Sequence, residues 1–435
     1  MNLKKPLAFL GSLSMIVTMA ACGSSTGSGS RDSNGKTIIK VQTFNNYGYG
    51  KSTAERAGAN LWAQYEKEHP NIKIEETVAS SSDEARTAFN TAISSGSNAY
   101  DVYGVDISWM PSIRAIAHKF VDLGSYIKTN SWPDWVRKGG ESADGTLIGA
   151  GTDIGPTALC YRSDLFAAAG LPTDREQVRQ LFGGDDASWD RFFQIGQEYT
   201  KKTGKPFIDS ISDISYVMKA QMNEVYVSKS NKITATSSAM KRMFDLLAAN
   251  KNISAGLSTW SDDWNAAFKA NNGFAVLTCP AWELNNVKGN SGENFKGWDI
   301  ADVTPGGAGA NQGESWLVVP NSSPVKSEAA KLVAWLTSPQ QQAKVFSTAS
   351  NFPSSPDAQK LSAVKNKKDG YFNDAPVGEI FTHRAEAIKH VPYMNGQYYD
   401  IDTKFGNALN RIDVTKEQGA AQAWKQYEND VKALS

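Results

Sequence analysis

The N-terminal part of the folded chain alternates between β-branched runs and amphipathic segments. The runs at 38–44, 72–78 and 100–105 have the period and composition of strands. A capping box at 52–55 predicts a helix that runs toward 69, and Ser81 predicts the start of a second helix. Strands that alternate with helices in this way predict a mostly parallel sheet covered by helices, and hence an α/β fold class.

Polar and aromatic side chains follow two of these predicted strands. Tyr47 lies in the loop after the first strand, and Asp106 and Trp109 come directly after the third. In parallel sheets, ligands bind at the carboxyl ends of the strands. We therefore expect these three side chains to lie on one rim of the sheet.

Helical spacing returns in the C-terminal part of the chain. Residues 327–337 predict a helix, and Ser338 followed by Pro339 predicts the start of the next one. Apolar residues at helical spacing across 420–434 predict an amphipathic closing helix. A chain of 435 residues has room for two or three domains, at roughly 150 residues each.

The first 21 residues have the pattern of an export signal. Lys4 and Lys5 precede a short apolar run, and small residues lead up to Cys22. The run is too short to span a membrane as a helix. The arrangement resembles the bacterial lipoprotein signal, which implies an acylated Cys22 and a protein anchored on the extracellular face of the cell membrane. An ordinary secretory signal with an incidental cysteine is the alternative.

Residues 22–36, rich in Gly and Ser, predict a flexible tether.

Composition narrows the class of partner. The formal net charge is zero, so the chain offers no electrostatic footprint for nucleic acid or anionic lipid. Its 12 Trp, 15 Tyr and 18 Phe often stand beside Gly, Pro, Asn or Asp instead of inside periodic apolar runs. Aromatic residues in loops favour a recognition surface over a core position.

Four fragments carry a family resemblance by their order and spacing. They read TALCYRSDLFAAAGLP at 157–172, FAVLTCPAW at 274–282, GESWLVVP at 313–320 and AWLTSPQ at 334–340. This order resembles the carbohydrate-binding family of extracellular solute-binding proteins of bacterial ABC importers, which includes maltose-binding proteins. The resemblance covers nearly all of the chain after the signal.

The resemblance implies a type II periplasmic-binding-protein fold and a way of working. Two α/β lobes, each with a mostly parallel sheet flanked by helices, would be joined by a hinge that the chain crosses more than once. We expect lobe one at 37–155 plus 306–350 and lobe two at 156–305 plus 351–435. A monomer would close on a carbohydrate, an oligosaccharide in view of the number of aromatic residues, and would dock on an ABC permease.

Sugars present hydroxyl groups for hydrogen bonding and C–H faces for stacking, so a sugar site needs carboxylates, amides or His beside flat aromatic rings. Trp282, followed by Glu283, is the strongest candidate, because an indole after the turn at Pro280 is poorly placed for a core. Trp316 could equally be a core residue, Glu314 a rim charge, and His390 a solvated loop residue. The candidate ligand-binding residues are Tyr47, Asp106, Trp109, Asp153, Asp209, Tyr216, Trp282, Glu314, Trp316 and His390.

Motifs for other chemistry are missing. The four His residues have no metal-ligand spacing, and neither a G-x-S-x-G nor an H-E-x-x-H motif is present, so we expect no metal, no cofactor and no enzyme activity. Cys160 and Cys279 could form a disulfide in an exported protein or remain two buried thiols. Two alternatives stay open: an anchored glycoside hydrolase, which needs only two facing carboxylates, and a peptide-binding or adhesion lipoprotein.

Overall fold

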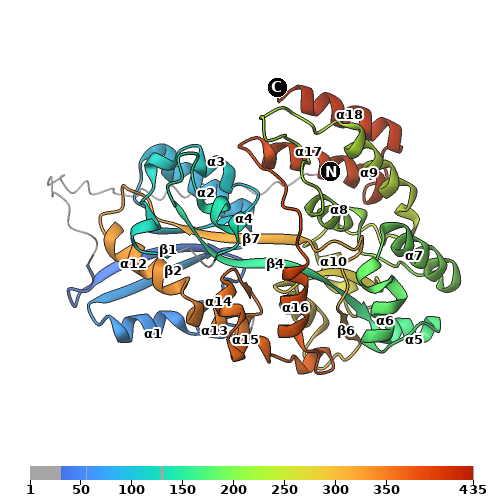
Figure 1. Ribbon diagram of the computed structural model, residues 1–435, viewed down its shortest axis with the longest axis horizontal. Helices are drawn as coiled ribbons and strands as arrows, with labels where there is room; N and C mark the ends of the chain where they lie inside the picture. The colour runs from blue at the N-terminus through green and yellow to red at the C-terminus, as the bar shows by residue number, and fades with distance from the viewer. Residues whose placement is uncertain (1–30, 55, 129–131, 435) are drawn as a thin grey trace, which may run out of the picture.

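A computed structural model describes residues 31–54, 56–128 and 132–434, so Cys22 and the signal lie outside the described residues. The fold is α/β, as expected. Figure 1 shows two halves side by side, with two long strands running from one half into the other. Among the described residues, no helix is long and apolar enough to cross a membrane.

The predicted strands and their parallel pairing are confirmed in the first half. Strand β1 (Thr37–Phe44) lies between β2 (Ile72–Ala79) and β3 (Val102–Asp106) and pairs parallel with both. Helices α1 (Leu61–Glu68) and α2 (Ser82–Ser95) make the connections. The predicted cap of α2 is also confirmed, because the Ser81 side chain accepts a hydrogen bond from the first turn of the helix.

Helix α1 begins later than the capping box predicted. The Ser52 hydroxyl caps no helix; it donates to the carbonyl of Gly58 and accepts from the Gly58 N–H, both at 2.9 Å. The backbones of Gly50 and Gly58 lie so close that a Cβ on Gly58 would stand 2.3 Å from the Gly50 carbonyl oxygen. Local hydrogen bonding of the Ser side chain therefore closes a loop here, and the prediction of a helix from 52 was wrong.

The two crossing strands are antiparallel. Strand β4 (Gly149–Arg162) pairs with β7 (Asn311–Val318), which in turn pairs antiparallel with β3. Three more strands pair antiparallel with β4. Of these, β8 (Phe352–Pro353) lies beside the stretch paired with β7, and β5 (Val276–Pro280) and β6 (Trp298–Ala301) pair farther along. The expectation of mostly parallel sheets thus holds around β1, whereas the pairing along β4 and β7 is antiparallel.

Helices cover both halves, and Figure 1 shows α1, α2 and α12 in one half and α5, α7 and α18 in the other. The helix starting at Pro339 is confirmed, as is the closing helix, whose buried side chains include Trp424 and Tyr427. The remaining α-helices are α3 (Met110–Arg114), α4 (Asp134–Gly140), α5 (Ser163–Ala169), α6 (Arg175–Phe182), α7 (Trp189–Thr203), α8 (Ile211–Ala220), α9 (Ser238–Ala249), α10 (Asp262–Ala267), α11 (Glu283–Ser291), α12 (Lys326–Leu336), α13 (Pro339–Ala349), α14 (Pro356–Gln359), α15 (Ser362–Lys365), α16 (Val377–Glu386), α17 (Tyr398–Asp413) and α18 (Ala420–Lys432). The short 3₁₀ helices are η1 (Ala117–Lys119), η2 (Leu123–Ser125), η3 (Gly184–Asp186), η4 (Lys251–Ile253) and η5 (Gly370–Phe372).

Two large hydrophobic clusters and one disulfide hold these elements together. One cluster runs from β1 through β7 to β6, and the other packs α5–α9 against α17 and α18. Cys160 of β4 and Cys279 of β5 form the disulfide, with their Cα atoms 5.5 Å apart. The structure thereby decides in favour of the bonded pair, which the sequence left open.

Candidate binding site

Three carboxylates that were predicted separately come together where β3, β7 and β4 run side by side. Ser315 of β7 is the ladder partner of Asp106 on one side and of Asp153 on the other. Glu314, one residue earlier on β7, is the ladder partner of Ile154. The antiparallel crossing of β4 and β7 therefore brings Asp153 and Glu314 to the end of β3.

Burial makes these carboxylates hard to ionise. Glu314 is only 3% exposed, and its Oε1 atom has no hydrogen-bond partner among the described residues. Burial, followed by the charge of Asp153, raises the pKa of Glu314 well above its usual range. Burial also raises the pKa of Asp153 to about 6, with a smaller contribution from the charge of Asp106. This group of acceptors is therefore short of hydrogen-bond donors.

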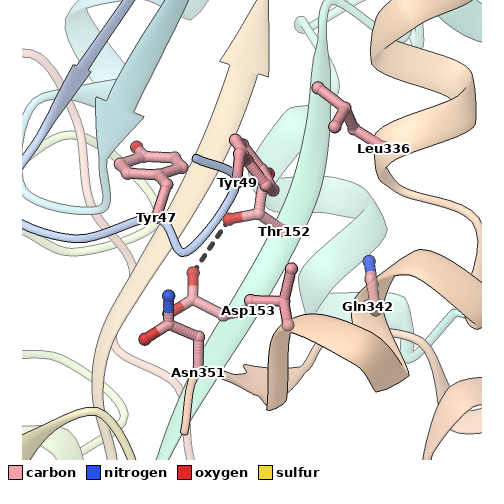
Figure 2. A pocket seen from close by; sticks show the side chains of 8 residues that line it. Tyr47, Tyr49, Thr152, Asp153, Leu336, Gln342 and Asn351 are labelled. Atoms are coloured by element: carbon pink, nitrogen blue, oxygen red, sulfur yellow. Dashed lines mark hydrogen bonds between the residues drawn. The ribbon is translucent and has the colours of Figure 1, made fainter. Parts of the chain in front are cut away.

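Tyr47 and Asp153 share a small pocket beside these strands. Figure 2 shows Asp153 and Thr152 of β4 close to Tyr47 and Tyr49 from the loop after β1, with a 2.9 Å hydrogen bond from Thr152 Oγ1 to Asp153. The cavity itself measures about 10 Å³, room for about one water molecule. This pocket by itself is therefore too small for a ring-sized ligand.

A second group of three carboxylates, which we call the carboxylate trio, consists of Asp209, Asp213 and Glu283. Asp213 stands in the first turn of α8 because the Ser210 side chain caps that helix by accepting the Asp213 N–H. Glu283 opens α11, directly after the predicted residue Trp282. Helix starts therefore position two of the three acids.

Hydrogen bonds hold the trio in place. Asp213 accepts from Thr278 Oγ1 at 2.5 Å and from Gln312 Nε2 at 3.3 Å. Asp209 accepts from the indole N–H of Trp264 at 2.8 Å. Glu283 is only 4% exposed; its Oε2 atom accepts from Asn286, but its Oε1 atom finds no hydrogen-bond partner among the described residues.

The trio raises the pKa values of its own members. Burial comes first for all three: it raises the pKa of Asp213 to about 6 and those of Asp209 and Glu283 well above their usual range. The charge of Asp213 adds to the pKa of both neighbours, and the charge of Asp209 adds further to that of Glu283. The trio can therefore donate protons or accept hydrogen bonds, depending on pH and on what is bound.

Two stacked indoles lie beside the trio. The Trp260 ring is stacked on Trp282 at 6.2 Å between centroids and 26° between planes. The Trp282 N–H donates to the carbonyl of Gln312 at 2.9 Å, and Gln312 in turn bonds Asp213. Trp260 is 55% exposed, which is unusual for so large an apolar side chain. The pair offers an open aromatic surface connected to buried acceptors.

Tyr216 lies where charges from both halves of the molecule act on it. It is 45% exposed on α8. Its pKa is raised first by the charge of Asp402, then by burial, and then by the charges of Asp213, Asp106 and Asp83. Asp83 and Asp106 belong to α2 and β3 in the first half, whereas Asp213 and Asp402 belong to α8 and α17 in the second. Tyr216 therefore faces both halves.

The structure buries two predicted indoles in the core and gives a third predicted residue, His390, a partner other than the carboxylates. Trp109 is only 1% exposed and its indole N–H donates to Ser82 at 2.9 Å, so its ring belongs to the core. Trp316 is also buried, and its ring lies 2.6 Å from the position that a Cβ on Gly139 would take. His390 bonds Asn223 at 2.8 Å, and among the described residues no hydrogen bond joins it to the carboxylates.

The candidate residues chosen from the sequence did not include Trp260, Glu283 or Asp213. Trp260 lies in STWSDD at 258–263, before α10, and a loop indole among Ser, Thr and Asp is the one signal that could have singled it out. Its backbone has a φ of 71°, an unusual conformation for a bulky residue, which turns the ring toward Trp282. Only the fold brings it there.

A second pocket, of about 720 Å³ including open solvent, lies beside β6 and η5. Its carboxylate, Asp299, is already paired with Arg175 at 2.9 Å. No buried polar atom of its lining residues lacks a partner. Nowhere in the described part of the chain do three or more His, Cys, Asp or Glu side chains form a group that could hold a metal ion.

Comparisons with known proteins agree on one family. Residues 60–372 match the family described as bacterial extracellular solute-binding protein. A crystal structure of an extracellular solute-binding protein of family 1 is 38% identical, with a TM-score of 0.80 over 91% of this chain and 99% of that chain. An ABC transporter associated binding protein from B. animalis subsp. lactis, in complex with β-1,6-galactobiose, is 18% identical with a TM-score of 0.73 over 91% of this chain and 96% of that chain, and supports the fold.

A more distant relative is the arabinooligosaccharide-binding protein of Bacillus subtilis (strain 168). It is 24% identical over 227 residues, which is 51% of this chain and about half (48%) of the relative. The match to the family description spans most of the folded chain and the crystal structure of a family 1 protein aligns over nearly its whole length. This chain therefore belongs to the family of bacterial extracellular solute-binding proteins.

Proposed function

We propose that this protein is the substrate-capturing component of an ABC importer and that its ligand is a carbohydrate, specifically an oligosaccharide. The observation that carries this proposal is the open Trp260–Trp282 surface beside buried acceptors that lack donors. A sugar ring has C–H faces that stack on indoles and hydroxyl groups that donate to carboxylates. Family membership and the sugar named for two relatives support the same ligand class.

The proposed ligand lies between two lobes, 37–155 plus 306–350 and 156–305 plus 351–435. In this proposal Asp106, Asp153 and Glu314 contact it from the strand ends, and Tyr216 and Trp282 contact it from the second lobe. Contacts made by both lobes at once exist only when the lobes are closed, so ligand shifts the population toward the closed form. The closed monomer then docks on a membrane permease.

The test is a binding screen. A ligand that binds only the folded protein raises its melting temperature. A panel of neutral and amine-bearing oligosaccharides should therefore give hits by thermal shift, to be confirmed by calorimetry. Binding with no new reducing ends is expected. If no saccharide binds, or if shorter sugars are steadily released, the proposal fails.

Trp282→Ala tests the aromatic surface. Because half of a stacked platform is lost while the ring contributes little core, we expect affinity for the best saccharide to fall at least about tenfold, the equivalent of about 1.4 kcal/mol. Tyr126→Ala is the matched control, since Tyr126 is also an exposed aromatic residue. Unchanged affinity in the Trp282 variant, measured by calorimetry, would remove Trp282 from the site.

We further propose that Cys22 is acylated and anchors the protein on the extracellular face of the membrane. Its place after small residues, at the end of a short apolar run, supports this. Stable anchoring needs more than one acyl chain. In cell fractionation, Cys22→Ser should move the protein from membranes to the medium or soluble fraction, whereas Ser24→Ala should not. Continued membrane retention of the Cys22 variant would refute the anchor.

A further inference from the structure

The carboxylate trio, Asp209, Asp213 and Glu283, is not neutralised by the protein. Among the described residues, no Lys, Arg or His forms an ion pair with any of its members. The cation on the same helix, Lys219, is already paired with Asp402. The acids behind the trio add negative charge, since Asp413 raises the pKa of Asp209. Ionised acids are costly to bury without a counter-charge, so in the empty protein the trio holds on to protons, and a positive group that entered would allow it to ionise.

A buried carboxylate oxygen without a donor lies at the same place. Glu283 is 96% removed from solvent, given its 4% exposure, yet its Oε1 atom has no hydrogen-bond partner. The Oε1 atom of Gln312, whose Nε2 bonds Asp213, is buried without a partner too. Buried acceptors in native proteins almost always have a donor. One such atom on the trio and one on its neighbour Gln312 leave acceptors that N–H or O–H donors of a ligand could satisfy.

The character of the missing group follows from what surrounds it. Neutral hydroxyl groups would satisfy the acceptors but would not stabilise the ionised form of the trio. In the described part of the chain the acids are not arranged to hold a metal ion. An organic ammonium group supplies three donors and one positive charge. It is also attracted to the face of an indole, and the Trp260–Trp282 pair adjoins the trio.

We propose that the ligand is an amino sugar, an oligosaccharide with a free protonated amino group held by Asp213 and Glu283 while its ring stacks on the Trp260–Trp282 pair. This inference rests on the proposed carbohydrate function and narrows it. Asp209, tied to Trp264, contributes charge from behind without direct contact. The carboxylates at Asp106, Asp153 and Glu314 have no comparable exposed indole among their described ring contacts and bind neutral hydroxyl groups in this scheme.

Calorimetry with matched sugars tests the proposal on the full-length protein. Each set contains a disaccharide of 2-amino sugars, its N-acetylated form and its 2-hydroxyl form, in both the gluco and the galacto series at pH 7. We expect the free amine to bind at least tenfold more tightly than both other members of its set. If hydroxyl or acetylated forms bind as well or better in every set that binds, the amino-sugar inference fails while the carbohydrate function stands. If no sugar in any set binds, both fail.

Variants locate the effect. Glu283→Gln and Asp213→Asn should each lower affinity for the free amine at least tenfold while changing affinity for the 2-hydroxyl form less than threefold. Glu293→Gln, which removes an exposed acid close by in the sequence, is the matched control and should change neither. Melting curves verify folding, and Glu283→Gln should not lower the melting temperature because it removes an unpaired buried acid. Equal losses for both sugars would show general damage and would refute the role in charge recognition.

Discussion

At the scale of single residues, the acids of this protein are placed against the usual rule that buried carboxylates are paired. Asp153 and Asp213 each have a pKa raised to about 6, mainly by burial. Such an arrangement favours ligand affinity, because acceptors that are already held in place can bind the donors of the ligand without further ordering. The empty protein must then be less stable than it could be.

The pH dependence of stability checks this consequence. A carboxyl with a folded pKa of about 6 and an ordinary value of 3.8 keeps its proton in the folded state where the unfolded chain has lost it. Its stabilising contribution is complete below about pH 4 and is lost as the pH rises through 6, a change on the order of 2–3 kcal/mol. In urea unfolding of the empty protein, Asp213→Asn should flatten the fall in unfolding free energy between pH 5 and pH 7.5. Asp263→Asn, at an exposed position, should leave the wild-type slope, and an equal slope in both variants would contradict the assignment.

Two indoles, Trp282 and Trp316, show that residue type alone does not decide between a ligand contact and a core position. Both were candidate ligand contacts, but the sequence favoured only Trp282 and left Trp316 open between ligand contact and core. The structure leaves Trp282 half-buried in contact with Trp260 but packs Trp316 beneath Gly139. The deciding factor is a glycine distant in sequence that leaves room for the ring. No local pattern around Trp316 contains that information.

At the scale of elements, β4 is the strand on which both halves depend. It pairs with β7 and β8 along one part of its length and with β5 and β6 along another. Register shifts at 151–153 and 154–156 lie within the part paired with β7, on either side of Asp153 and Ile154. Bulges bend a strand and re-aim its side chains. This irregularity therefore bears on how Asp153 is directed.

The disulfide between β4 and β5 should stabilise this element. It joins residues 119 apart in sequence, and closing so long a loop restricts the unfolded chain strongly. The double variant Cys160→Ala/Cys279→Ala should therefore lose about 2–5 kcal/mol of unfolding free energy in guanidinium titration. Thiol counting on the denatured wild type, with and without reductant, is the control for bond formation. A loss below about 1 kcal/mol would mean that the bond contributes little.

At the scale of the whole molecule, direct contacts join α2 of the first half to α17 of the second. The Tyr399 hydroxyl donates to Asp83 at 2.6 Å, and the guanidinium of Arg86 lies 3.8 Å from the Tyr399 ring centroid. Arg114 also donates to the carbonyl of Met394 at 3.0 Å. If the halves move apart as proposed, these contacts exist only in the closed form and favour it.

Tyr399→Phe measures that contribution. Loss of one hydrogen bond should weaken the closed form by about 0.5–1.5 kcal/mol, so saccharide affinity should fall about two- to tenfold with the site itself intact. Where the empty wild type is partly closed, small-angle scattering should show a larger radius of gyration for the empty variant. Where both proteins are fully open, their radii of gyration should be equal. Tyr126→Phe is the matched control. Equal affinity in the two variants would show that the contact does not bias closure.

The sequence by itself determined the elements whose signals are local. Strands β1–β3, the caps of α2, the start of α13 at Pro339 and the amphipathic face of α18 depend on neighbours within a turn or two, so their patterns could be read directly. The same holds for Asp106, since the end of a strand is a local feature. The segment at Ser52 was predicted to start a capped helix, whereas the Ser52 hydroxyl closes a loop. The prediction failed because two local hydrogen-bonding options compete there.

Only the tertiary structure decided which side chains meet. Residues that share the site come from segments far apart in the sequence, as Asp213 and Gln312 do across a 99-residue separation or Asp106 and Ser315 across neighbouring strands. The antiparallel crossing of β4 and β7, the disulfide, and the pairing of Trp260 with Trp282 arise from packing and long-range backbone pairing. These depend on the whole chain at once, because burial and register are set by what lies opposite in space.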